Sequence, residues 1–186
     1  VARATAAHTA LVVGDTSSAR FATGAGLNRF VAGQMITGPT DVRLRRAQDE
    51  HAVEIEGAHN GYDRTFGLVH ERRMTLSSDG LRLEGEDKLI ATKRDIPGSG
   101  QTDYVLRFHL HPTVRAELTE GGAAVLLTLP DDVQWLFRAS GLPVAIEESI
   151  FLGGREGPRQ TDQLVVAAKV REVPSLVWTM ECLSGQ

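Results

Sequence analysis

Residues 68–91 read LVHERRMTLSSDGLRLEGEDKLIA, and this stretch decides the fold class. It consists of two runs in which apolar residues recur between polar ones, as they do in half-buried strands. Between the runs lies Ser77-Ser78-Asp79-Gly80, and its Asp-Gly pair supplies the positive φ that a tight hairpin turn needs. The stretch therefore predicts two antiparallel strands, Leu68–Leu76 and Leu81–Ala91, joined by that turn.

Similar strand and turn signals fill most of the remaining chain. The connections are short, which favours antiparallel pairing, and no convincing helix, internal repeat or heptad is visible. We therefore predict an all-β fold, an antiparallel two-layer β-sandwich, as a single domain over residues 1–186. The further strands expected are Ala10–Val13, Asp103–His111, Ala123–Leu129, Val133–Ala139, Val144–Leu152, Gln163–Val170 and Ser175–Cys182.

Alternation is clearest around the polar turn Gln48-Asp49-Glu50. Val42 and Leu44 before the turn, and Val53 and Ile55 after it, fall on one face, whereas arginines and glutamates fall on the other. This pattern predicts a half-buried pair of strands with its apolar face toward the core.

A glycine-containing excursion, residues 23–40, precedes this pair. Its apolar residues show no steady period. Because such a long excursion in a compact domain is usually functional or mobile, we expect poor order here or contacts with a missing partner.

Composition excludes several classes of protein. Of the 186 residues, 41% are hydrophobic and 24% are charged, as in ordinary globular domains, and no apolar run approaches the roughly 18 residues of a membrane span. The net charge of −4 argues against a nucleic-acid binder. The single cysteine, Cys182, excludes an internal disulfide and a cysteine-based zinc cluster.

Six short motifs follow one another along the chain, each of them weak alone. In order, they are Arg3-Ala4-Thr5-Ala6-Ala7-His8-Thr9, His59-Asn60-Gly61-Tyr62, Val69-His70-Glu71-Arg72, Gly85-Glu86-Asp87-Lys88-Leu89, Phe108-His109-Leu110-His111-Pro112 and Glu147-Glu148-Ser149-Ile150. Together they resemble the C-terminal β-domain of the heparinase II/III family of polysaccharide lyases. The resemblance covers nearly the whole chain.

This resemblance implies a domain that begins inside a longer protein. In the family a helical N-terminal toroid carries most of the catalytic tyrosine and histidine chemistry, and it is absent here. We therefore expect no catalytic residue in this chain, and a supporting role in β-elimination on an acidic, uronate-containing polysaccharide. The same resemblance implies that Arg3, His59 and Tyr62 contact substrate, and that the parent protein is periplasmic or secreted.

The resemblance also implies that His8 is a zinc ligand in the full-length parent. The family's other ligands lie upstream of this chain, and zinc needs about four donors, so we expect no metal in the isolated chain. Thr9 stands where the family usually has asparagine after the metal-binding histidine, so we expect a side chain that supports the metal ligand in the family to be missing here.

Two other classes of function and one assembly stay open. A stand-alone carbohydrate-binding module would need an exposed aromatic platform, but aromatic content is only 5%, and Trp135 and Trp178 both lie in predicted strands with core-like neighbours. A small metal-dependent β-barrel enzyme would use His109 and His111, which alternate on one face of a strand. A homodimer could form by strand addition at the edge near Val1.

Overall fold

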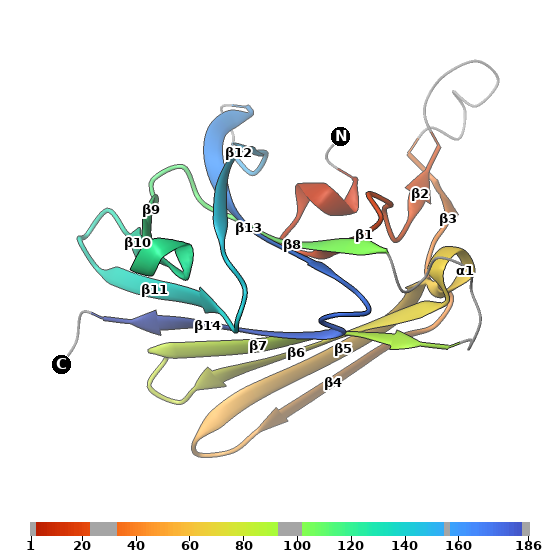
Figure 1. The fold of residues 1–186 in the computed structure, drawn as a ribbon, viewed down its shortest axis with the longest axis horizontal. Coiled ribbons are helices and arrows are strands. Elements are labelled where there is room, and N and C mark those ends of the chain that lie inside the picture. The colour runs from red at the N-terminus through yellow and green to blue at the C-terminus, as the bar shows by residue number, and fades with distance from the viewer. Residues whose placement is uncertain (1–2, 23–32, 93–101, 155–156, 184–186) are drawn as a thin grey trace.

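The computed structural model describes residues 3–22, 33–92, 102–154 and 157–183, and it confirms an all-β fold. Two antiparallel sheets face each other in a sandwich, and a two-stranded ribbon lies beside them (Figure 1). None of the helices in the described part of the chain has the length and apolar character that a membrane crossing needs.

The larger sheet has eight strands in the order β4-β5-β6-β7-β14-β11-β10-β9. In chain order these are β4 (Val42–Gln48), β5 (Ala52–Tyr62), β6 (Leu68–Ser77), β7 (Arg82–Ala91), β9 (Arg115–Thr119), β10 (Ala124–Thr128), β11 (Gln134–Ala139) and β14 (Ser175–Cys182). The smaller sheet has four strands in the order β1-β8-β13-β12, namely β1 (Leu11–Val13), β8 (Asp103–His109), β12 (Ala145–Phe151) and β13 (Arg159–Lys169).

The predicted hairpin forms as β6 and β7. Gly80 has a φ of 72°, and a carboxylate oxygen of Asp79 accepts hydrogen bonds from the Leu81 amide and the Ser77 hydroxyl. The turn chemistry of these residues is local, so the sequence was sufficient to place it.

Aromatic rings fill the core between the two sheets. Phe108 from the smaller sheet contacts Phe137 and Trp178 from the larger one, with ring centroids 4.9 and 4.8 Å apart. Gly85 makes room for the indole, because a Cβ at this position would lie 2.1 Å from Trp178. The core thus depends on a glycine in the middle of β7.

The prediction that β4 is half-buried is wrong. Val42 and Leu44 are 66% and 78% exposed, and Ile55 on β5 is 37% exposed. β4 is the edge strand of the larger sheet, and the smaller sheet lies over only part of that sheet (Figure 1). Alternation correctly indicated which side chains share a face, but not whether another layer covers them.

Only part of the 23–40 excursion lies within the described residues. Residues 23–32 lie outside the described ranges, so the expectation of poor order there stays a prediction. Residues 35–37 form a strand, β3 (Met35–Thr37), which pairs with β2 (Arg20–Phe21). The segment therefore contains regular structure that its aperiodic sequence did not indicate.

Other differences are small. β8 ends at His109, two residues earlier than predicted, and β9 was not predicted. The helical structure includes a 3-10 turn, η1 (Thr5–Ala7), a second 3-10 turn, η4 (Glu120–Gly122), and one four-residue helix, α1 (Asp63–Phe66). They are too short to change the fold class.

Candidate functional site

The segment that carries His8 is residues 3–10, which we call the N-terminal segment. Its 3-10 turn η1 ends just before His8, and β1 follows three residues later. Hydrogen bonds tie the segment to the next loop, because the Thr5 amide donates to the Ser17 hydroxyl and the Ser18 amide donates to the Thr5 hydroxyl. The N-terminal segment is therefore held as a formed element.

Tyr62 anchors the strand that follows this segment. Its side chain is fully buried, and its hydroxyl donates to the Leu11 carbonyl over 2.8 Å. Burial raises the pKa of Tyr62 to about 12. The phenol is thus protonated at neutral pH and holds β1 against β5.

A buried carboxylate, Asp87, organises the middle of the larger sheet. It accepts hydrogen bonds from His70 Nε2 at 2.7 Å, Arg72 Nε at 2.8 Å and Trp178 Nε1 at 2.9 Å. Burial raises the pKa of Asp87, but the His70 hydrogen bond and the Arg72 charge outweigh it and hold the pKa below its ordinary 3.8. Asp87 is therefore an ionised, fully paired group inside the sandwich.

A hydrogen-bonded chain of imidazoles leads outward from Asp87. The Gly61 amide donates to His59 Nδ1 at 3.1 Å, so the proton of neutral His59 is on Nε2. That Nε2 lies 3.3 Å from His70 Nδ1. Burial, with repulsion from His70 and Arg72, lowers the pKa of His59 to about 4.

Arg72 connects this network to the N-terminal segment. Its Nη1 donates to the Thr9 carbonyl at 2.9 Å, and the Thr9 hydroxyl in turn accepts from the His109 amide at 3.1 Å. One residue beside His8 is thus bound to both sheets. The hydrogen bonds of Thr9 with Arg72 and His109 also hold the residues next to Thr9 in place.

Beyond the N-terminal segment, five polar residues share the face of the smaller sheet that points away from the core. Register pairs Glu147 with Gln163 and Gln163 with His109 across three strands. The other two residues, Ser149 and Arg107, occupy neighbouring rows of the same face. We call Arg107, His109, Glu147, Ser149 and Gln163 the small-sheet polar face.

His109 is the centre of this polar face. Its Nε2 donates to the Ala6 carbonyl at 3.0 Å, so its Nδ1 accepts from the Ser149 hydroxyl at 2.7 Å. Burial lowers the pKa of His109, and the charges of Arg107 and His8 lower it further. The residues on either side of His8, Ala6 and Thr9, are thus both hydrogen-bonded to His109.

Two atoms of the polar face are buried without a hydrogen-bond partner among the described residues. They are Arg107 Nη1, a donor, and Gln163 Oε1, an acceptor, and the Gln163 side chain as a whole is 9% exposed. Gln163 Nε2 makes only long contacts of 3.5 Å to Glu147 and to the Glu148 carbonyl. The face thus has unused capacity for a further polar group.

The residues predicted to bind substrate do not meet on one surface. Arg3 is exposed, donates to the Gly33 carbonyl and lies over the Phe21 ring, whereas His59 and Tyr62 are held in the interior contacts described above. Direct contact of these three residues with a substrate stays a prediction. The structure shows instead that Tyr62 is hydrogen-bonded to Leu11 on β1, and that His59 contacts Gly61 and His70.

The sequence did not single out Asp87 or Trp178 as a functional pair. A signal was nevertheless present, because Leu83, Asp87 and Leu89 share one face of β7 and a charged residue among apolar ones needs a buried partner. Their partners come from β6 and β14, which only the sheet register brings together.

Residues that could hold a metal do not gather in the described part of the chain. No group of three or more histidine, cysteine, aspartate or glutamate side chains with suitable geometry is found there. His8 is exposed, and His111 lies beyond β8, where its Nδ1 is 2.7 Å from the Thr113 hydroxyl. These residues alone do not fit a zinc site, so a role for His8 requires ligands from elsewhere.

The tryptophans do not form an exposed platform. Trp178 is buried and bound to Asp87, and Trp135 is partly buried against the core. The other tyrosine, Tyr104, donates to the Val173 carbonyl, and burial raises its pKa to about 12. Neither tyrosine of the chain is suited to act as a base near neutral pH.

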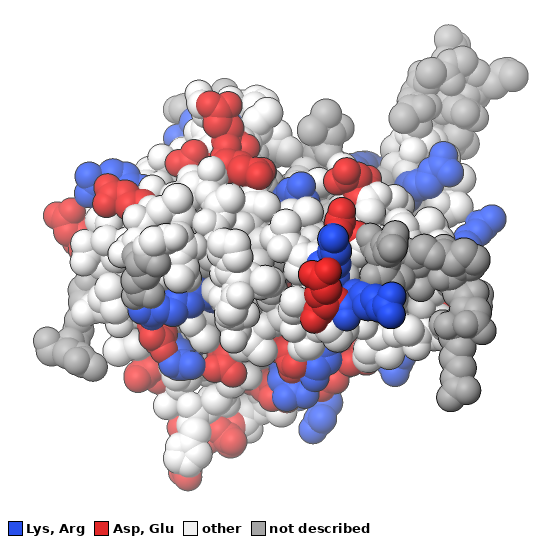
Figure 2. Space-filling model, viewed as in Figure 1, with Lys and Arg blue, Asp and Glu red and all other residues white. Residues whose placement is uncertain are grey.

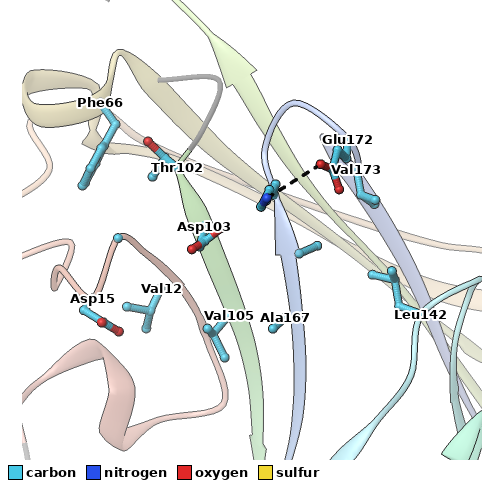
Figure 3. Close-up of a pocket in the computed structure, with 13 residues that line it drawn as sticks. Val12, Asp15, Phe66, Thr102, Asp103, Val105, Leu142, Ala167, Glu172 and Val173 are labelled. Atoms are coloured by element: carbon cyan, nitrogen blue, oxygen red, sulfur yellow. Dashed lines mark ion pairs between the residues drawn. The ribbon is translucent and has the colours of Figure 1, made fainter. Parts of the chain in front are cut away.

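A cleft of about 780 Å³ opens at one end of the smaller sheet (Figure 3). Val12, Val105 and Ala167 contribute apolar side chains to its lining, and Asp15, Asp103 and Glu172 contribute carboxylates, with Lys169 at 4.0 Å from Glu172. The excess of negative charge disfavours a polyanion. The small-sheet polar face, by comparison, carries one arginine, Arg107, and one glutamate, Glu147.

Comparison with known proteins identifies a family that the sequence matches and solved structures that share the fold. The family described as "Heparinase II/III-like, C-terminal" matches residues 1–179. A curated relative, FtsZ-localized protein C of Caulobacter vibrioides, is 31% identical over 141 residues, which are 74% of this chain and 24% of the relative. The chain thus spans about a quarter of that relative's length.

Two solved structures share the fold. The heparan sulfate lyase HepC of Pedobacter heparinus matches 99% of this chain and 25% of its own, with a TM-score of 0.70 and 12% identity. A crystal structure of heparinase III matches 96% of this chain and 24% of its own, with a TM-score of 0.64 and 10% identity. At such identities the likeness shows the fold alone.

Proposed function

Because the chain belongs to the heparinase II/III-like C-terminal family, we propose that it is the C-terminal β-sandwich of a polysaccharide lyase. The parent would cleave an acidic, uronate-containing polysaccharide by β-elimination. This domain would form one wall of the substrate cleft, contribute His8 to a structural zinc site and support the catalytic domain.

The observation that carries the proposal is that the N-terminal segment, which contains His8, is hydrogen-bonded to His109 of the small-sheet polar face through Ala6 and Thr9. The buried network around Asp87 holds this region through Arg72 and Thr9, and Tyr62 holds the adjacent strand. Sites that act on a substrate need such rigid support behind the residues that contact it.

In the parent protein, the steps of β-elimination would be divided between this domain and the N-terminal domain. β-Elimination requires removal of the proton beside the uronate carboxylate, neutralisation of that carboxylate and protonation of the leaving oxygen. An arginine suits the neutralising role, because its planar guanidinium matches a carboxylate. We assign that role to Arg107, and we assign the base and the acid to the N-terminal domain.

For the metal, we propose that His8 supplies one imidazole nitrogen to zinc. The zinc would hold protein segments together, with the remaining ligands from outside this chain. Metal analysis of the longer protein and of its His8→Ala variant tests this point. Unchanged zinc content in the variant would refute the assignment.

Activity of the longer protein tests the main proposal. Heparan sulfate, chondroitin sulfate and alginate would be supplied in turn, and the unsaturated uronate product followed by its ultraviolet absorbance. We expect turnover of at least one substrate, and a fall of about 10²-fold or more in kcat/KM for Arg107→Ala, as for loss of a transition-state contact. Arg115→Ala, on the exposed edge strand β9, serves as the control.

A second function is favoured by the curated relative. That relative is more similar to this chain than the solved lyases are, and its name places it with FtsZ. We propose as the alternative that this domain belongs to a protein that associates with FtsZ rather than to an active lyase.

Co-sedimentation separates the two functions. The longer protein would be spun with FtsZ polymers and, in parallel, assayed on the polysaccharides. Sedimentation without turnover supports the alternative, and turnover without sedimentation supports the lyase.

A further inference from the structure

We propose that the free edge of β4 accepts an added strand from a partner polypeptide, with acidic residues alternating with apolar ones. This interaction surface is separate from the small-sheet polar face and does not depend on the proposed function. β4 is seven residues long and is the last strand in its sheet, so among the described residues it pairs on one side only, with β5. An open edge of this length offers backbone groups to an incoming strand.

Charge alternates across the strands on the outer face of the larger sheet. In one row, Arg45 pairs with Glu56, Glu56 with Arg73, and Arg73 with Glu86. The space-filling view shows acidic and basic side chains interspersed over the region of β4–β7 (Figure 2). Since directly opposed strand residues favour opposite charges, the next position beyond Arg45 favours a carboxylate.

The row that contains Arg43, two residues before Arg45 on β4, also favours a carboxylate on the added strand. Lys88 pairs with Glu71, and Arg43 occupies the β4 position of that row, with Ala58 between. Arg43 itself has only an exposed ion pair with Asp41 at 3.5 Å. An added strand would therefore place acidic residues at two positions spaced by two, opposite Arg43 and Arg45.

The inner face of β4 calls for apolar side chains on the same added strand. Val42 and Leu44 point to this face and are largely exposed, with Gly57 opposite Leu44 on β5, and Arg46 and Gln48 follow them on the same face. A Cβ on Gly57 would meet nothing closer than 3.8 Å, so this glycine is not required by the fold, unlike Gly85.

A second copy of this chain is a poor occupant. In the register centred on Leu44, antiparallel pairing of β4 with itself would bring Arg43 of one copy opposite Arg45 of the other, and like charges directly opposed are destabilising. The partner is therefore a different segment, complementary in charge.

Peptide binding to the chain tests the proposal. The probes are two peptides of about nine residues, one alternating valine with glutamate and one alternating valine with lysine, titrated while amide signals are followed by NMR. We expect saturable shifts confined to β4 and β5, and a preference of about tenfold or more for the glutamate peptide. In the Arg43→Glu/Arg45→Glu variant the preference should reverse.

Controls make every outcome decisive. Arg115→Glu, on the opposite edge strand β9, should leave the preference unchanged, and melting curves should show that the exposed substitutions preserve the fold. Absence of saturable binding up to about 1 mM, equal binding of both peptides, or no response to the double substitution would overturn the proposal. So would sedimentation showing a dimer that the double substitution abolishes.

Discussion

The inner face of the larger sheet has a covered part and an open part. Around Gly85, Asp87 and Trp178, the smaller sheet closes over the strands, Asp87 is hydrogen-bonded to His70, Arg72 and Trp178, and Trp178 packs against Phe108. Around Val42, Leu44 and Gly57, the same sheet continues with the same two-residue alternation but without a second layer. The comparison shows that alternation determines which face of the sheet a side chain points to, whereas the presence of an opposing sheet determines whether that side chain is buried.

Asp87→Asn should produce the largest effect, because it removes the charge that pairs with Arg72 and turns an amide N–H toward Trp178. Loss of one member of a buried pair typically costs about 3–5 kcal/mol, and urea unfolding would measure it. Glu86→Gln, one residue away on the outer face, is the matched control and should cost less than about 1 kcal/mol. Similar losses for both would show that the covered part is not special.

Substituting the two glycines compares the two parts directly. Gly85→Ala places a Cβ against Trp178, which should cost about 1–3 kcal/mol through overpacking. Gly57→Ala meets only ordinary contacts, so its free energy of unfolding should change by no more than about 0.5 kcal/mol. A large loss for Gly57→Ala would mean that the open part is packed after all.

Acid should weaken the covered part through His59. The pKa of His59 is about 4 in the folded chain and 6.5 when unperturbed, so between these values the unfolded chain binds a proton that the folded chain does not. The free energy of unfolding should therefore fall as pH drops from about 6.5 to about 4, and His59 makes no further contribution below that. Melting temperatures across this window for the chain and for His59→Gln check the effect, since the variant should lose part of the slope.

The smallest effect is expected at Leu44. Because this side chain is largely exposed, Leu44→Ala should change stability by no more than about 0.5 kcal/mol. Leu176→Ala, at a buried position of β14, should cost about 2–5 kcal/mol in the same chemical unfolding experiment. Equal costs would contradict the division of the sheet into covered and open parts.

Local chemistry explains what could be predicted. The β6–β7 turn rests on Asp79 and Gly80, and the strand alternation rests on neighbours two residues apart, so both were readable. The strand β9 and the exposure of β4 were not, because they depend on which distant segment lies opposite. For the candidate site, His8 and His109 were recognised as chemically interesting, but their proximity depends on the path of the N-terminal segment across β8.

The sequence alone determined the all-β class, the antiparallel hairpins and the family resemblance, because these follow from residue types at short, regular spacings. Only the tertiary structure decided that His59, His70, Arg72 and Trp178 converge on Asp87, and that β4 has an open edge. Register and layer coverage arise from contacts between residues far apart in the chain, and the free energy of those contacts is set by all the partners together.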